Sequence, residues 1–159
     1  MPEKLSSSKA QQDAERDILS SLEEMLSTAE APVRFNQANP KEWGLKLDGY
    51  CSEPLIFVEA WARLGSPSSS QRHKVMNDLG KMWLAEQIVG KPARKILAVM
   101  CDDAVKFLNS NSWSKVLAER QGIEVITVPV PEATREKVRQ AQINQAKGMK
   151  AKQPGSIAS

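Results

Sequence analysis

Residues 43–64 read WGLKLDGYCSEPLIFVEAWARL, and this stretch decides the predicted fold. Residues 43–50 alternate apolar and polar side chains, as a strand with one solvated face does. Residues 55–64 are apolar on both faces except at Glu59 and Arg63, which is typical of a central strand in a sheet covered on both sides. The four-residue link CSEP between these segments is short enough for a β-hairpin.

Helices and further strands are predicted on either side of this hairpin from apolar spacing and from turn residues. They lie at residues 10–28 (helix), 69–89 (helix), 95–101 (strand), 102–121 (helix, interrupted near 109–111), 123–128 (strand) and 131–147 (helix), with an optional early strand near 33–35. The sequence therefore predicts an α/β fold, with a mixed central sheet of four or five strands flanked by helices in the order α-β-β-α-β-α-β-α.

The composition suits one globular domain, with 41% hydrophobic and 26% charged residues in a chain of 159. We expect the domain to span residues 10–130, preceded by a disordered N-terminus at 1–9. A basic helix at 131–147 and a disordered tail at 148–159 follow it. Residues 131–159 hold six basic and two acidic residues, a net +4, which leaves −1 for the rest of a chain of net charge +3. Such a basic end is typical of an arm that binds a nucleic-acid backbone or of a solubilising tail.

Several functional classes find no support in the sequence. No apolar run approaches the length of a membrane helix, and the N-terminus lacks the apolar core of a secretory signal. Cys51 and Cys101 form no zinc-ligand spacing or disulfide framework, so we expect a reduced, cytoplasmic protein. No nucleotide-binding P-loop motif and no G-x-S-x-G nucleophile motif occurs.

Glu59 is the unusual residue of the predicted central strand, because a buried carboxylate must be paired, protonated or bound to a cation. The sequence offers two residues through which the charge of Glu59 could be compensated. Arg63 lies two residues along on the same face and offers an ion pair. Asp48 lies at the end of the preceding strand, and the hairpin would bring it beside Glu59, where two carboxylates repel and favour a cation such as Mg²⁺. Alternatively, Asp48 is a turn residue before Gly49.

The helix after the hairpin carries a polar stripe, since Gln71, Lys74, Asp78 and Lys81 are spaced i, i+3, i+7 and i+10. Gln71 and Lys74 lie near the end of the central strand. For these two residues, a functional role and a solvent-exposed position without function are both consistent with the sequence. For Asp78 and Lys81 we favour a solvated face with ion pairs along the helix. His73, the only histidine, points away from this stripe and is expected at the surface or on a phosphate.

The predicted order of elements and these acidic residues resemble the PD-(D/E)XK nuclease superfamily, which has the restriction-endonuclease-like fold. The resemblance covers residues 10–128. Asp48 and Glu59, with ten residues between them, match the Asp and Glu of the motif. The motif lysine would stand two residues after Glu59, where this chain has Trp61. In some members a lysine from the next helix takes its place, and Lys74 is the candidate here.

The resemblance implies Mg²⁺-dependent or Mn²⁺-dependent hydrolysis of phosphodiester bonds in DNA. Asp48, Glu59 and the backbone carbonyl of Ala60 are expected to hold the metal ion. Lys74 is expected to orient or deprotonate the attacking water, and Gln71 to hydrogen-bond the water or a phosphate oxygen.

The resemblance also bears on partners. We expect Arg63, His73 and Lys81 to contact the nucleic acid, and some relatives carry a further metal-site acid on the first helix, for which Glu23 and Glu24 are open. A homodimer or larger assembly is plausible for so small a domain. The alternative is a catalytically degenerate module that binds nucleic acid or protein, and this alternative would explain the tryptophan at the lysine position.

Overall fold

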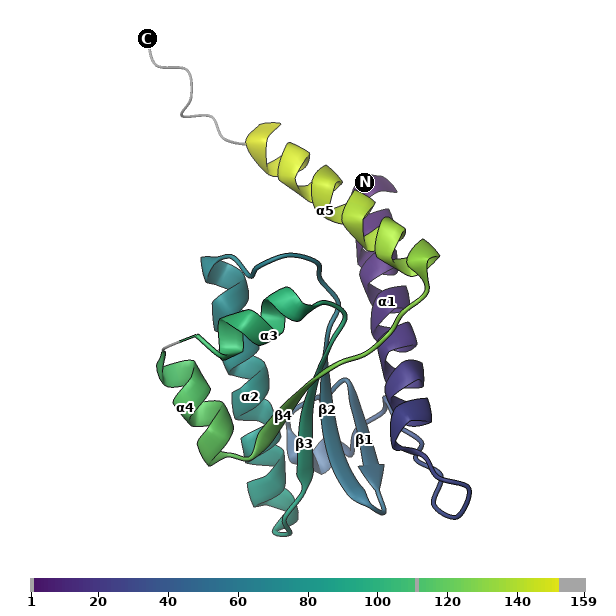
Figure 1. Cartoon of the computed structure of the whole chain (residues 1–159), viewed down its shortest axis with the longest axis vertical. Coiled ribbons are helices and arrows are strands. Elements are labelled where there is room, and N and C mark those ends of the chain that lie inside the picture. The colour runs from purple at the N-terminus through teal and green to yellow at the C-terminus, as the bar shows by residue number, and fades with distance from the viewer. Residues whose placement is uncertain (1, 111, 152–159) are drawn as a thin grey trace.

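The computed structural model describes residues 2–110 and 112–151, with side chains described over 9–110 and 112–148. A four-stranded sheet lies between two layers of helices (Figure 1). The elements are α1 (Pro2–Leu26), η1 (Lys41–Trp43), β1 (Gly49–Ser52), β2 (Leu55–Trp61), α2 (Ser69–Val89), β3 (Arg94–Val99), α3 (Asp102–Leu108), α4 (Trp113–Arg120), β4 (Ile123–Thr127) and α5 (Glu132–Ala151).

The strand order is β1-β2-β3-β4, with β1 antiparallel to β2 and the other neighbours parallel. This arrangement confirms the predicted α/β fold with a mixed sheet, in its four-stranded form. The predicted hairpin is also confirmed, since Ser52 pairs with Leu55 across the turn. The predicted interruption near 109–111 separates α3 from α4.

The central strand β2 separates two different cores, because successive side chains of a strand point to opposite faces. Ile56, Val58 and Ala60 belong to the core beneath α1 and α5. Phe57 and Trp61 belong to the core beneath α2, α3 and α4, which lie on the other side of the sheet (Figure 1). Glu59 therefore points toward α2, into a layer whose core is mainly apolar but also contains the buried Asp78.

The strand predicted at residues 43–50 is wrong over most of its length. Residues 41–43 form the 3-10 helix η1, and Gly44 follows in a left-handed conformation with φ 65°. This conformation suits glycine and interrupts an extended strand. The apolar residues of the stretch are buried by side-chain packing, as shown by Trp43, whose ring packs edge-on against Tyr50 at 5.0 Å.

The ends of the chain also differ from the prediction. α1 begins at Pro2 and so includes most of residues 1–9, for which disorder was expected; no glycine or β-branched residue interrupts the chain before Ile18. α5 continues to Ala151, and the rest of the predicted tail lies outside the described residues. Residues 33–35 form no strand, although Asn36 makes one isolated bridge to β1. Within residues 2–110 and 112–151, no helix is both long and apolar enough to cross a membrane.

The basic helix α5 is attached to the sheet through one glutamine and packs along α1. The side chain of Gln142 accepts a hydrogen bond from the Leu64 backbone N–H (2.8 Å) and donates one to the Leu64 carbonyl (3.0 Å). These two groups lie just beyond the end of β2. Gln142 thus replaces the neighbouring strand that the backbone of Leu64 lacks.

We expect Gln142→Ala to destabilise the protein by about 1–2 kcal/mol, because two partly buried backbone groups lose their partner. Urea unfolding measures this loss, and amide hydrogen exchange at Leu64 reports where it acts. Gln140→Ala is the matched control on the same helix, since Gln140 is exposed and bonds only Asn144. Equal stability of the two variants would contradict the attachment described here.

Candidate functional site

Four acidic side chains from four segments lie close enough to influence one another's ionisation. They are Glu15 on α1, Asp48 in the loop before β1, Glu59 on β2 and Asp78 on α2, and we refer to them as the carboxylate cluster. Asp48 and Asp78 raise the pKa of both glutamates. Their mutual repulsion makes the cluster a region of concentrated negative charge in which a cation is favoured.

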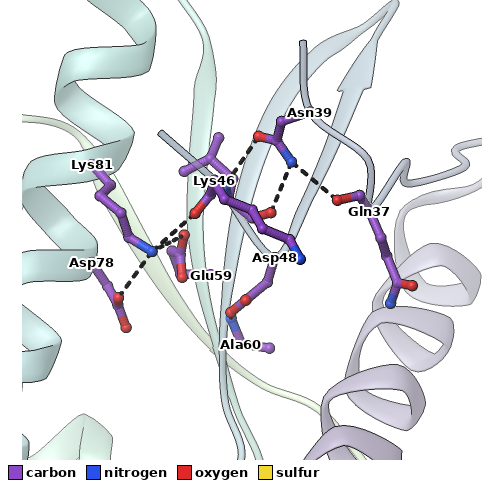
Figure 2. A network of polar contacts seen from close by, with 9 residues as sticks. Gln37, Asn39, Lys46, Asp48, Glu59, Ala60, Asp78 and Lys81 are labelled. Atoms are coloured by element: carbon purple, nitrogen blue, oxygen red, sulfur yellow. Dashed lines mark hydrogen bonds and ion pairs between the residues drawn. The ribbon is translucent and has the colours of Figure 1, made fainter. Parts of the chain in front are cut away.

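Lys81 on α2 supplies the positive charge that lies beside Glu59, the buried member of this cluster (Figure 2). Its ammonium lies 3.1 Å from Glu59 Oε1 and 3.5 Å from Asp78 Oδ1, and it donates a hydrogen bond to the Lys46 carbonyl at 3.0 Å. Burial lowers the pKa of Lys81, but the attraction of Glu59 and Asp78 outweighs burial and the net shift is upward. Lys81 therefore stays charged among oxygen atoms contributed by three segments.

The carboxylate of Glu59 is the most buried group of the cluster, with 1% of the residue exposed. Burial, followed by repulsion from Asp48 and Asp78, raises its pKa to about 10, although Lys81 opposes the shift. The contact with Lys81 satisfies the distance of an ion pair but not the directionality of a hydrogen bond, so Glu59 Oε1 has no hydrogen-bond partner within the described part of the chain. Lys81 therefore compensates the charge of Glu59 without a well-directed hydrogen bond to Oε1.

Asp48 is held against the edge of β2 by the backbone. Its Oδ2 accepts a hydrogen bond from the Ala60 N–H at 2.9 Å. The pairing of β1 with β2 begins at Gly49 and Val58, so no strand neighbour covers this edge at Ala60. Both backbone groups of a strand residue point to the same side, and the Ala60 carbonyl therefore shares this edge with Asp48.

The loop that carries Asp48 is fixed by Asn39, a residue that the sequence prediction missed. Asn39 donates to the Leu47 carbonyl (2.9 Å) and the Gln37 carbonyl (3.2 Å), and it accepts from the Leu47 N–H (3.0 Å) (Figure 2). An amide side chain thus takes the place of a strand partner for Leu47. This contact fixes the backbone of Leu47, between Lys46, whose carbonyl binds Lys81, and Asp48, which binds Ala60.

The acid that α1 contributes to the cluster is Glu15, not Glu23 or Glu24. Burial and the charge of Asp48 raise the pKa of Glu15 to about 7, while Lys74 and a hydrogen bond from Gln11 act in the opposite direction. Glu23 lies elsewhere, where its carboxylate accepts from the Phe35 N–H at 3.1 Å. Glu24 is exposed. A sequence signal for Glu15 exists, because it is an acid on the same helical stripe as the buried Ile18 and Leu22.

The helix α2 places its polar residues differently from the prediction. The predicted ion pair of Asp78 with Lys81 is confirmed, but Asp78 is 4% exposed, so the expectation that it belongs to a solvated face is wrong. Gln71 forms the capping box of α2 with Ser68, and its amide oxygen accepts from the Ser68 N–H at 2.9 Å. Lys81, for which a nucleic-acid contact is also predicted, pairs with the carboxylates of Glu59 and Asp78. The lysine within ion-pair distance of Glu59 is Lys81 and not Lys74.

The other expected site residues lie around the cluster. The Lys74 ammonium is 6.0 Å from the centre of the Trp61 ring and close enough to Glu15 to lower its pKa. His73 is exposed, and no carboxylate of the described chain lies within ion-pair distance of Arg63. The ion pair of Glu59 with Arg63 that the sequence left open is therefore not formed.

Metal ligation by side chains alone finds limited support. Among the residues that the structure describes, no group of three or more Asp, Glu, His or Cys side chains has the arrangement of a metal site. A metal ion would depend on carboxylates together with backbone carbonyl and solvent oxygens. Mg²⁺ is commonly bound in this way, with one or two carboxylates and several waters.

No protein-family model, curated protein or solved structure matches this chain significantly. The resemblance to the PD-(D/E)XK superfamily therefore rests on the residues and the order of elements alone.

We expect Glu15→Gln to stabilise the protein at pH 8 and to leave its stability near pH 4.5 unchanged. A raised pKa means that the fold favours neutral Glu15, so wild-type stability falls as pH rises from the ordinary value of 4.5 through about 7. The gain at pH 8 should be about 1–2 kcal/mol after allowance for solvent screening. Thermal unfolding at both pH values measures it, with the exposed Glu24→Gln as control. A constant difference between variant and wild type would contradict the shift.

Proposed function

We propose that this protein is a metal-dependent nuclease that hydrolyses phosphodiester bonds of DNA. The observation that carries the proposal is the convergence of the carboxylate cluster with Lys81 and Lys74 at one end of the sheet. Four acids oppose two lysines there, and burial and repulsion raise the pKa of Glu15, Glu59 and Asp78. Perturbed carboxyl groups gathered in this way are typical of catalytic sites.

The residues present fit Mg²⁺ or Mn²⁺. Asp48, Glu59 and the Ala60 carbonyl offer hard oxygen ligands, and Glu59 Oε1 is a buried acceptor without a hydrogen bond. The remaining ligands are water and substrate oxygens. When bound, the ion polarises the scissile phosphate and lowers the pKa of an attacking water.

The side chains of this chain then have distinct tasks. Glu15, half-buried and with a pKa near 7, accepts the proton of the attacking water at neutral pH. The Lys81 ammonium, which replaces the lysine missing at Trp61, offsets the negative charge that develops on the phosphate. Lys74, exposed beside Trp61, contacts a phosphate oxygen at the entrance to the site.

The proposal extends to location and partners. Cys51 and Cys101 are both free thiols, in keeping with a reducing, cytoplasmic location. The exposed basic side chains Lys137, Arg139 and Lys147 on α5 provide charge for binding a nucleic-acid backbone. A second copy of the chain would supply further surface for a duplex.

A second candidate function is a binding module that has lost catalysis. The observation favouring it is that Glu59 is 1% exposed and already faces the Lys81 ammonium at 3.1 Å, so the fold compensates this carboxylate internally. In that case Asp48 is a structural residue that caps the edge of β2 through its bond to Ala60.

The proposed activity is tested with supercoiled plasmid DNA in Mg²⁺ or Mn²⁺. We expect nicking by the wild type and a loss of at least about 100-fold in Glu59→Gln, which removes a proposed metal ligand, and a similar loss in Lys81→Met, which removes a positive charge used in the transition state. Glu119→Gln, on the exposed side of α4, is the matched control. Equal background rates for wild type and Glu59→Gln would exclude catalysis at this site and favour the binding module.

Metal binding is expected to strengthen with pH. Glu59 carries a proton at neutral pH because its pKa is raised to about 10, and a metal ion must displace this proton. The Mn²⁺ affinity should therefore rise up to tenfold per pH unit between pH 6 and 8, with proton release seen by titration calorimetry in two buffers. Glu59→Gln should abolish both. A pH-independent affinity would contradict the assignment of Glu59 as a ligand.

A further inference from the structure

A small cavity beside Arg63 has the chemistry of a site for a phosphate oxygen. It lies between α1, α5 and the segment that follows β2, and it has room for about one oxygen atom, roughly 10 Å³. It is lined by one arginine and three glutamines, namely Arg63, Gln11, Gln142 and Gln145, together with Ala62, Val138 and Ala141. No carboxylate contributes to it.

Arg63 is a half-buried cation without a counter-charge. None of the carboxylates that the structure describes comes within 4.0 Å of its guanidinium, and burial is the only cause of the lowered pKa of Arg63. Arginine is weakly hydrated and presents several donors in a planar fork that matches phosphate oxygens. An anion in the cavity would supply the charge that the surrounding amides cannot.

The backbone around Arg63 is held in place. Its carbonyl accepts from the Cys101 thiol at 3.7 Å, and both backbone groups of Leu64 are bonded to Gln142. The Gln142 amide nitrogen has two hydrogens, of which one is used by Leu64, so the other is available to a ligand. The site is therefore preorganised by contacts that do not depend on an anion.

The cavity adjoins the carboxylate cluster through α1. Gln11 lines the cavity, and its hydrogen bond lowers the pKa of Glu15, which lies one helical turn away on the same face. One helical turn is about 5.4 Å along the axis of α1, so the cavity and Glu15 are neighbours along this helix. A polynucleotide strand at the cluster would therefore pass close to the cavity.

We propose that Arg63, together with Gln11, Gln142 and Gln145, binds a backbone phosphate of the polynucleotide adjacent to the one at the carboxylate cluster. The identity of the ligand rests on the proposed nuclease function, whereas the anion site itself rests only on the cavity. Arg63 acts here by binding and positioning the strand.

The test measures binding of a fluorescein-labelled DNA duplex by anisotropy in EDTA, over a series of KCl concentrations, so that cleavage plays no part. For Arg63→Gln we expect about tenfold weaker binding and a salt slope smaller by about 0.9, the value for one lost phosphate contact. Arg63→Lys should recover part of the affinity. Arg120→Gln, the same charge change on exposed α4, should match the wild type.

Inorganic phosphate separates the two sources of the ligand. We expect 10–50 mM phosphate (about the range in which weak anion sites fill) to raise the melting temperature of the wild type more than that of Arg63→Gln. A phosphate effect without any change in the salt slope of DNA binding would overturn the polynucleotide assignment. If Arg63→Gln matches the wild type both in its phosphate-induced shift of melting temperature and in its DNA binding, no anion site exists.

The nicking assay of Glu59→Gln and the salt slope of Arg63→Gln together test the nuclease activity and the phosphate site separately. Loss of nicking in Glu59→Gln with an unchanged salt slope in Arg63→Gln would refute the phosphate site and leave the nuclease in place. Absence of nicking in the wild type with a reduced slope in Arg63→Gln would refute the nuclease and support the anion site. Circular dichroism of both variants establishes that they are folded.

Discussion

The carboxylate of Glu59 lies in the central strand with 1% of the residue exposed, 3.1 Å from the Lys81 ammonium. Burial disfavours its ionised form, and Asp48 and Asp78 add repulsion. Lys81 is the one cation that lowers its pKa. The position of α2 across β2 follows from this constraint, because Lys81 must face Glu59 while Val75 and the other apolar residues of the helix reach the core.

The start of β1 determines where the second carboxylate, Asp48, lies relative to Glu59. Strand pairing begins at Gly49, so the preceding residue Asp48 is not paired as a strand residue and its side chain binds the uncovered edge of β2 at Ala60. Gly49 allows this close packing, because a Cβ atom there would lie 3.1 Å from both Leu19 and Phe35 and would require their side chains to shift. The close approach of α1 to this glycine also places Glu15 near Asp48. One tight contact thus brings three segments together around Glu59.

Much of this fold was predictable from local signals. The helix at 69–89 and its end at Gly90, the hairpin and the two parallel strands follow from apolar periodicity and turn chemistry. The stretch at 43–48 was mispredicted because its alternating pattern comes from side-chain packing, while its backbone is bonded by the Asn39 side chain. Local spacing carries no information about such a contact.

The composition of the site was less predictable than the fold. Lys74 and Lys81 lie seven residues apart on one stripe, about 10 Å along the helix, and periodicity cannot decide which of them faces Glu59. That choice depends on how far α2 slides along β2, which is a tertiary property. The capping role of Gln71 is not evident from the polar stripe, because the capping box that uses it begins at Ser68, one residue outside the helix.

The cluster is hard to explain as a structural device alone. A buried ion pair needs one acid for Lys81, yet Glu59 and Asp78 both face it, and the charges of Asp48 and Asp78 raise the pKa of both Glu59 and Glu15. Amides or apolar groups of similar size would remove this repulsion, and such replacements are often neutral or stabilising. Local conflicts of this kind are expected where function has been retained at a cost in stability. Lys81, still 28% exposed at its side chain, satisfies only part of the negative charge. A divalent cation would displace the proton of Glu59, and for this reason the excess of acidic side chains, more than the motif spacing of Asp48 and Glu59, is the observation on which the proposed metal-dependent site rests.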